Sequence, residues 1–212
     1  MGLRHATDAD HVVAVTTLVV RQRRPKAALT MGALWGLGHS LTIISAGAAI
    51  IAFKLTIPER TAHMLEFLVG AMLAALGALN LLGFRVGRRH EHRDDHHHHE
   101  HLEDLQWAPG GAQAVRALVV GVVHGLAGSA ELSLLVLAAI PATAGAAAAM
   151  AYLGIFCVGT LVGMAVLSSL FGWAAKSASD SLPISDWLEA GVGIASLAFG
   201  LYIMYHFGRA LT

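Results

Sequence analysis

The stretch His5-Ala6-Thr7-Asp8-Ala9-Asp10-His11 leads directly into the apolar run Val12 to Val20. Two imidazoles and two carboxylates therefore stand where a hydrophobic helix begins. A charged side chain at membrane depth costs about 2.5 to 3.5 kcal/mol on insertion scales, so it is retained where it faces a bundle interior, pairs or binds something. Because imidazole and carboxylate together suit a borderline divalent metal, this stretch predicts a metal site inside a membrane protein.

The composition is that of a polytopic membrane protein. The 212 residues are 56% hydrophobic and 13% charged, with a mean hydropathy of +0.62, far from an ordinary soluble domain. The formal net charge of zero hides a concentration of charged residues between positions 85 and 104, so net charge indicates no partner. The single cysteine, Cys157, lies in an apolar run. We expect it to be a buried, inert thiol, without a disulfide or a cysteine-based metal motif.

About six helical spans are expected. Hydrocarbon about 30 Å thick is crossed at 1.5 Å per residue, so windows of about 20 apolar residues indicate spanning helices. Five such windows are Ala27 to Phe53, Leu65 to Phe84, Ala114 to Ile140, Gly145 to Trp173 and Leu188 to Phe207. A sixth, Gly2 to Val20, spans only if its polar residues are also inside the membrane, facing protein or a water-filled cavity. The predicted fold class is all-α, a bundle of transmembrane helices.

Basic residues follow the first and the third of these segments. They are Arg21, Arg23, Arg24 and Lys26 in one loop, and Arg85, Arg88, Arg89 and Arg93 in the other. Because cytoplasmic loops carry an excess of lysine and arginine, both loops are expected inside. Counting crossings then places the loop from Lys54 to Met64 outside, together with both ends of the chain.

Segments four to six resemble a second copy of segments one to three. Leu65-Glu66 with Gly70 and Gly77 matches Leu188-Glu189 with Gly193 and Gly200, and Gly2-Leu3-Arg4-His5 resembles Gly121-Val122-Val123-His124. Because each copy has an odd number of spans, the second would insert upside down, as in the inverted repeats of many transporters. We therefore expect a first repeat (1–84), a His-rich cytoplasmic loop (85–113) and a second repeat (114–212). The alternative is chance similarity between glycine-rich apolar helices.

The first segment holds the strongest candidates for metal ligands. On a regular helix, His5, Asp8 and His11 fall within about 120° of one another, while Asp10 points about 100° away from His11. All four meet one ion only if the segment is broken or is entered from two sides, as in transporter sites. The alternative is an ordinary helix start, with Thr7 or Asp8 as the cap and the histidines at a headgroup interface. A cap explains one polar residue, whereas this segment has four.

Three further polar residues lie inside apolar helices. His39 follows Gly36 and Gly38, whose small size lets a neighbouring helix approach and places the histidine in the bundle core. His124 and Glu131 lie two turns apart on one face of a later helix. We take all three as candidates for the ion path. The alternatives are a hydrogen-bonded core histidine at position 39, glycines near His124 that only pack helices, and a Glu131 that pairs with a basic group.

The mid-chain loop is rich in histidine. It holds seven histidines, interleaved with acidic residues, at positions 90, 92, 96, 97, 98, 99 and 101. Such a tract does not bury a core and is expected to be disordered. Its composition favours loose binding of Ni, Co, Cu or Zn, as a buffer or a sensor of load, over a plain solvated linker.

The first two motifs resemble the signatures of the nickel/cobalt transporter family. The segment from His5 to His11 resembles the signature His, four residues, Asp-His, and Leu37-Gly38-His39-Ser40 is similar to the second signature on the next helix. The resemblance implies an integral membrane permease for Ni(II) and Co(II). The residues that it implicates in metal selection are His5, Asp10, His11 and His39.

Two later patterns of the family are altered in this chain. An Asp-Thr-Ala-Thr-Glu run appears as Ala127-Gly128-Ser129-Ala130-Glu131. An Asp-Thr-x-Asp-Gly run appears as Ser168-Ser169-Leu170-Phe171-Gly172, without either acid. In this the chain is similar to the shorter, urease-accessory type of nickel permease. Family members usually have a helix before the first signature, whereas here Met1 stands four residues ahead of His5.

We therefore expect a permease, not an enzyme, that moves Ni(II) or Co(II) across the cytoplasmic membrane. Uptake is the direction that the resemblance implies, and efflux is the main alternative. The ion is the substrate, no cofactor is expected, and the partners are the ion and the lipid bilayer, without nucleic acid. The expected metal ligands are His5, Asp8, Asp10, His11, His39, His124 and Glu131. A metal-dependent membrane enzyme with Glu131 as acid or base, or a metal sensor without transport, are the remaining alternatives.

Overall fold

The computed structural model describes residues 1–20, 22, 24–90, 111–139, 145–181 and 185–211. Of the helical residues 83–90, 129–139, 178–181 and 185–186 it describes the backbone. Within these ranges the secondary structure is entirely helical, which confirms the all-α class. The helices are α1 (Gly2–His5), α2 (Ala9–Val19), α3 (Pro25–Phe53), α4 (Glu59–His90), α5 (Gly111–Ala139), α6 (Gly145–Ser181) and α7 (Ser185–Gly208).

Five of these helices are long and apolar enough to cross a membrane: α3, α4, α5, α6 and α7. They correspond to the five predicted windows. The chain is therefore an integral membrane protein with a bundle of spanning helices. Pro25 is in the first turn of α3, where its missing N–H costs nothing, and Lys54 ends the helix in a left-handed conformation with its N–H bonded to the Ile50 carbonyl.

The sixth expected segment is not one helix but two short ones, α1 and α2. The Thr7 hydroxyl donates to the Arg4 carbonyl at 2.6 Å, and Asp8 takes an extended conformation as the residue before α2. Threonine and aspartate side chains compete with the helical backbone for hydrogen bonds. The segment is therefore broken before α2, which is one of the two conditions under which its polar residues were expected to meet. Asp8 is at the N-cap position of α2, as in the alternative of an ordinary helix start, but its side chain makes no capping hydrogen bond.

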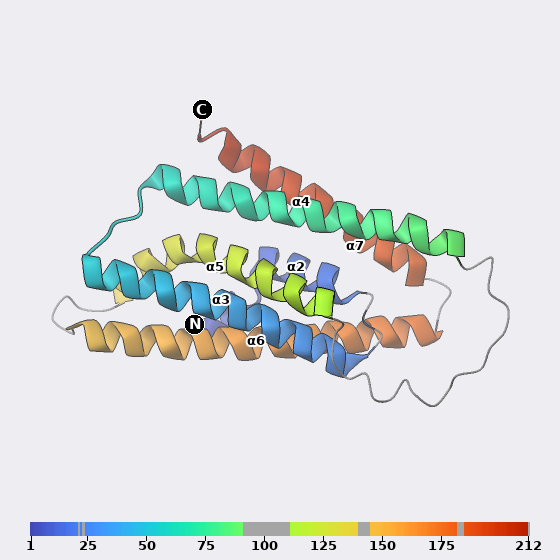
Figure 1. Cartoon of the computed structure of the whole chain (residues 1–212), viewed down its shortest axis with the longest axis horizontal. Coiled ribbons are helices and arrows are strands. Elements are labelled where there is room, and N and C mark those ends of the chain that lie inside the picture. Colours follow the sequence, from blue (N-terminus) through green and yellow to red (C-terminus); the bar gives the residue numbers. More distant parts are fainter. Residues whose placement is uncertain (21, 23, 91–110, 140–144, 182–184, 212) are drawn as a thin grey trace.

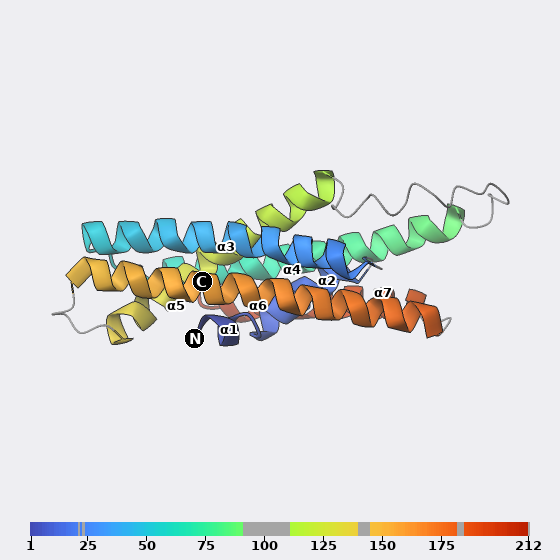
Figure 2. The same ribbon diagram turned by 90° about the horizontal axis from the view of Figure 1, so that it is seen from below.

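Four of the long helices form two antiparallel pairs, α3 with α6 and α4 with α7, whereas α3 and α5 run in the same direction (Figure 1). α3 lies along α6 and α5, α4 lies along α7, and α1 rests on α6. Turned by 90°, Figure 2 shows α1 and α2 against α6, and α5 crossing obliquely past α3 and α6. The short first segment is thus held inside the bundle by longer helices.

The surface and the interior have the polarity that a bilayer requires. Large apolar side chains point outward, including Leu41 at 62% exposure and Ile155 at 75%. The buried polar side chains include three histidines, His11, His39 and His124. Since the hydrocarbon of a bilayer does not solvate an imidazole, these side chains lie in the interior of the bundle.

The ends of the long helices fall into two groups, at opposite ends of the bundle. The start of α3 and the ends of α4 and α6 lie at one end of the bundle, while the end of α3 and the starts of α4 and α6 lie at the other (Figure 1). α4 continues to His90 and α5 begins at Gly111, so the helices extend into the predicted loop 85–113. The histidines beyond position 90 lie outside the described residues. The inverted repeat and the three-part division of the chain stay predictions.

Candidate metal site

Four histidines from four different elements meet inside the bundle; we call them the four-histidine cluster. They are His5 at the end of α1, His11 on α2, His39 in the middle of α3 and His124 on α5. The His11 ring is central: its centroid lies 4.6 Å from that of His5, 5.2 Å from that of His39 and 4.7 Å from that of His124. His11, His39 and His124 are each at most 2% exposed. The cluster joins ligands that are far apart in the chain.

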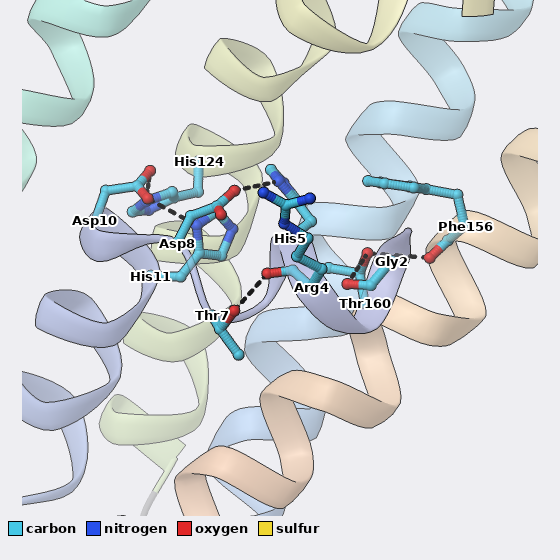
Figure 3. Close-up of polar contacts among 10 residues, drawn as sticks. All are labelled: Gly2, Arg4, His5, Thr7, Asp8, Asp10, His11, His124, Phe156 and Thr160. Atoms are coloured by element: carbon cyan, nitrogen blue, oxygen red, sulfur yellow. Dashed lines mark hydrogen bonds and ion pairs between the residues drawn. The ribbon is translucent and has the colours of Figure 1, made fainter. Parts of the chain in front are cut away.

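Two carboxylates hold three of these imidazoles in place. Asp10 bonds His11 Nδ1 through one oxygen and His124 Nε2 through the other, each at 3.0 Å. Asp8 bonds His5 Nδ1 at 2.8 Å. Figure 3 shows Asp10 between His11 and His124, and Asp8 beside His5. Because an ionised carboxylate only accepts hydrogen bonds, each of these ring nitrogens carries its proton toward the carboxylate.

The opposite ring nitrogens are then lone-pair donors with no protein partner. Among the described residues, the buried nitrogens without a hydrogen bond include His5 Nε2, His11 Nε2, His124 Nδ1 and both nitrogens of His39. Leaving a buried polar group unsatisfied costs about 1 to 3 kcal/mol. Histidines whose second nitrogen is fixed by a carboxylate are the usual arrangement at metal centres. Three of these imidazoles thus present a free nitrogen opposite a carboxylate, and neutral His39 adds one lone-pair nitrogen, so the cluster offers four donor nitrogens suited to a metal ion.

The donor atoms form two overlapping groups that share His11. In the first group, of His5, His11 and His39, and in the second, of Asp10, His11 and His124, the ligand atoms lie within 4.8 Å of one another. With metal–nitrogen bonds of about 2.0 to 2.1 Å, two donors of one ion are at most about 4.2 Å apart. Small movements of the side chains would bring either group into binding distance.

The glycines of α5 let it approach α3 closely enough to complete the cluster. A Cβ atom on Gly125 would lie 2.6 Å from the His39 carbonyl oxygen, so only glycine fits there. A Cβ atom on Gly128 would lie 3.6 Å from His39 Cε1 and 3.8 Å from His5 Nε2. Close helix contact through small residues thus brings His124 to His11.

A cavity of about 240 Å³ lies beside the cluster. Its lining residues are His5, Asp8, Ala9, Asp10, His11, Glu66, His124, Ala127, Gly128, Phe199 and Ile203. Glu66, on α4, was not among the predicted site residues, although its place in the repeat match marked it. Phe199 and Ile203 carried no signal in the sequence because apolar residues are common throughout α7.

The predicted ligands are brought together to different degrees. His5, His11, His39 and His124 meet directly, and Asp10 touches two of them. Asp8 stands at the edge, with a side chain 48% exposed. Asp10 and His11 were expected to point apart, yet they bond each other, because α2 begins only at Ala9 and its first turn is free of a preceding helix. Glu131 belongs to α5, and its side chain lies outside the described part.

Two proteins of known name are similar to this chain. It is 31% identical over 208 residues to the urease accessory protein UreH of Bacillus sp. (strain TB-90), covering 98% of this chain and 89% of that protein. It is 34% identical over 100 residues to the high-affinity nickel transport protein of Cupriavidus necator, covering 42% of this chain and 28% of that protein. No family model matches the chain, and no solved structure matches it.

Proposed function

Because the chain belongs to the nickel/cobalt transporter family, in its shorter UreH-like type, we propose that it is a permease for Ni(II) or Co(II) with the four-histidine cluster as its ion site. The observation that carries the proposal is the set of buried ring nitrogens without partners, among them both nitrogens of His39. A fully buried imidazole with two unsatisfied nitrogens is costly in a bilayer. An ion that binds there in transit removes that cost.

The residues have separate roles in this proposal. His5 Nε2, His11 Nε2 and a nitrogen of His39 bind the ion, while His124 belongs to the second group, with Asp10 and His11, to which the ion can pass. Asp8 and Asp10 orient the imidazoles through their hydrogen bonds and supply the negative charge that offsets the ion. Such carboxylates are typically worth a factor of 10 to 100 in metal affinity.

The donor set accounts for a preference for late transition metals. Imidazole nitrogens suit nickel, copper and zinc, whereas Mg(II), Ca(II) and Mn(II) prefer oxygen ligands. By the Irving–Williams order Cu(II) binds such a set more tightly than Ni(II) does, so selection among late metals depends on geometry. The four imidazoles are held on four separate elements, so their positions limit the coordination geometry that a bound ion can take.

Uptake is the direction that we propose. The cavity continues from the cluster to Glu66 on α4 and Ile203 on α7, toward the end of the bundle where α4 begins (Figure 1). The basic loops assign that end to the outside of the cytoplasmic membrane. An ion from outside would therefore reach the cluster through this cavity.

Flux into proteoliposomes tests this function. We expect Ni(II) and Co(II) to enter liposomes that contain the protein, and Mn(II) to enter far more slowly. His39→Ala should abolish flux at unchanged protein content, because it removes a ligand with no other partner. His206→Ala is the matched control, since His206 is exposed on α7 and outside the cluster. Metal binding without flux, or equal flux by His39→Ala and the wild type, would overturn the proposal.

A further inference from the structure

The cavity beside the four-histidine cluster is lined by matching positions in the two halves of the chain. Positions 5, 8 and 9 line it from the first segment, and positions 124, 127 and 128 line it from α5 with the same spacing. Toward one end of the bundle, the lining continues with Glu66, Phe199 and Ile203. The two halves thus contribute matching positions to the centre of the cavity, to which the first segment adds Asp10 and His11, while the mouth uses α4 and α7 unequally.

Contacts between the halves are reciprocal around the cluster. A Cβ atom on Gly2 would lie 2.8 Å from the Thr160 nitrogen on α6, and one on Gly121 would lie 2.9 Å from the His39 nitrogen on α3. Gly2 and Gly121 are the matching positions of the repeat that the sequence suggests. In each half, the matching glycine therefore contacts the backbone of the middle helix of the other half, α6 for Gly2 and α3 for Gly121.

The contact between α4 and α7 is also reciprocal between matching positions of the two halves. A Cβ atom on Gly77 would lie 2.6 Å from the Gly193 oxygen, and one on Gly200 would lie 2.5 Å from the Gly70 oxygen. Gly70 matches Gly193, and Gly77 matches Gly200. Since α4 and α7 run antiparallel (Figure 1), a two-fold rotation between the halves would exchange these two contacts.

On the premise of the permease function, we propose that Glu189 and Asn80 line a second mouth of the ion path, on the opposite side of the membrane from Glu66 and Ile203. In the repeat, Glu189 occupies the position of Glu66, and Asn80 occupies the position of Ile203. This second mouth is closed in the structure. Asn80 is 6% exposed, and its amide donates to the Glu189 carbonyl oxygen at 3.5 Å. Leu76, which matches Phe199, is 4% exposed.

The chemistry of these residues fits a mouth for a cation. A carboxylate at the rim of a cleft attracts cations and raises their local concentration, and Glu66 and Glu189 are carboxylates at matching positions on opposite sides. An amide inside an apolar helix is costly unless it has a role. The alternative is that Asn80 only joins α4 to α7 by its hydrogen bond. In that case the charge of Glu189 has no effect on transport, and the experiments below distinguish the two cases.

Thiol labelling from each side of the membrane tests the second mouth. Asn80→Cys and Ile203→Cys are made separately in a Cys157→Ala background, which removes the natural thiol. A membrane-impermeant maleimide is applied to intact cells and to inverted vesicles, with and without Ni(II). We expect Ile203→Cys to react from the outside, and Asn80→Cys to react from the inside, at least several-fold faster when Ni(II) is being transported. Asn80→Cys that reacts from the outside, or that never reacts while its nickel flux is intact, overturns the proposal.

Kinetics provide a second measurement that needs no cysteine. Glu66→Gln should raise the KM for Ni(II) about tenfold when the ion is supplied from outside, and Glu189→Gln should raise it similarly in inverted vesicles only. Equal KM values for Glu189→Gln and the wild type in both orientations would refute the second mouth. If the wild type itself carries no nickel, the permease function fails instead, so the two failures are distinguishable.

Discussion

At the scale of the residue, Asp10 is the organising group of the site. Its two oxygens accept from His11 Nδ1 and from His124 Nε2, each at 3.0 Å, and so it sets the tautomers of two imidazoles from two helices. Asp8 acts on His5 alone. A carboxylate that fixes two ligands at once has more effect on a metal site than one that fixes a single ligand.

Substitution of these two acids should therefore have unequal effects. Asn at position 10 keeps the size of Asp but offers one acceptor and one donor, so either His11 or His124 must move its proton to the nitrogen that faces the ion. We expect Asp10→Asn to weaken Ni(II) binding by roughly 10- to 100-fold. Titration of the purified protein with Ni(II) measures this, with Asp8→Asn as the comparison. An equal loss in both variants, or none in Asp10→Asn, would show that Asp10 does not orient the ligands.

At the scale of the element, glycines set how closely the helices cross. α4 and α7 meet at Gly70, Gly77, Gly193 and Gly200, where backbone faces backbone. Lipid offers no hydrophobic driving force between helices, so such close packing is what holds them together. By contrast, a Cβ atom on Gly191 would meet nothing within 4 Å.

Alanine at Gly200 should therefore destabilise the bundle. Its Cβ atom would lie 2.5 Å from the Gly70 oxygen, and the backbone of α4 has no side chain to move aside. Overpacking of this kind costs about 1 to 3 kcal/mol, so we expect a lower midpoint of thermal or detergent-induced unfolding. Gly191→Ala, on the same helix, should leave the midpoint unchanged or raise it slightly, because alanine favours helix. If both variants unfolded alike, the crossing would not depend on Gly200.

At the scale of the whole molecule, the proposed ion site draws on most of the helices that the structure describes. α1, α2, α3 and α5 supply the four histidines, and the cavity adds residues of α4 and α7. The His-rich tract has seven histidines between positions 90 and 101, and those after His90 lie outside the described residues.

Deletion of residues 91–103 should separate storage from transport. We expect flux of Ni(II) to persist, because all four histidines of the cluster remain, while the number of Ni(II) ions bound per chain falls. Equilibrium dialysis gives the stoichiometry, and proteoliposomes give the flux. Complete loss of flux at normal membrane content would mean that the loop is part of the ion path.

Much of this architecture followed from local sequence. Apolar windows of about 20 residues determined the five long helices, because the thickness of the bilayer sets helix length whatever the partners are. The polar stretch from His5 to His11 required a break or an inward face, since lipid does not tolerate four such groups. The same cost of burial marked His5, His11, His39 and His124 as candidate ligands.

Only the tertiary structure decided which of these groups meet and in what role. Asp10 was expected to point away from His11, but the bend before α2 and the approach of α5 place it between His11 and His124. Glu66 joins the cavity because α4 packs beside the first segment. Hydrogen bonds between residues distant in the chain depend on helix crossings, and crossings depend on many small contacts at once. Sequence therefore determined the helices and the ligand types, while packing decided the partners of each ligand.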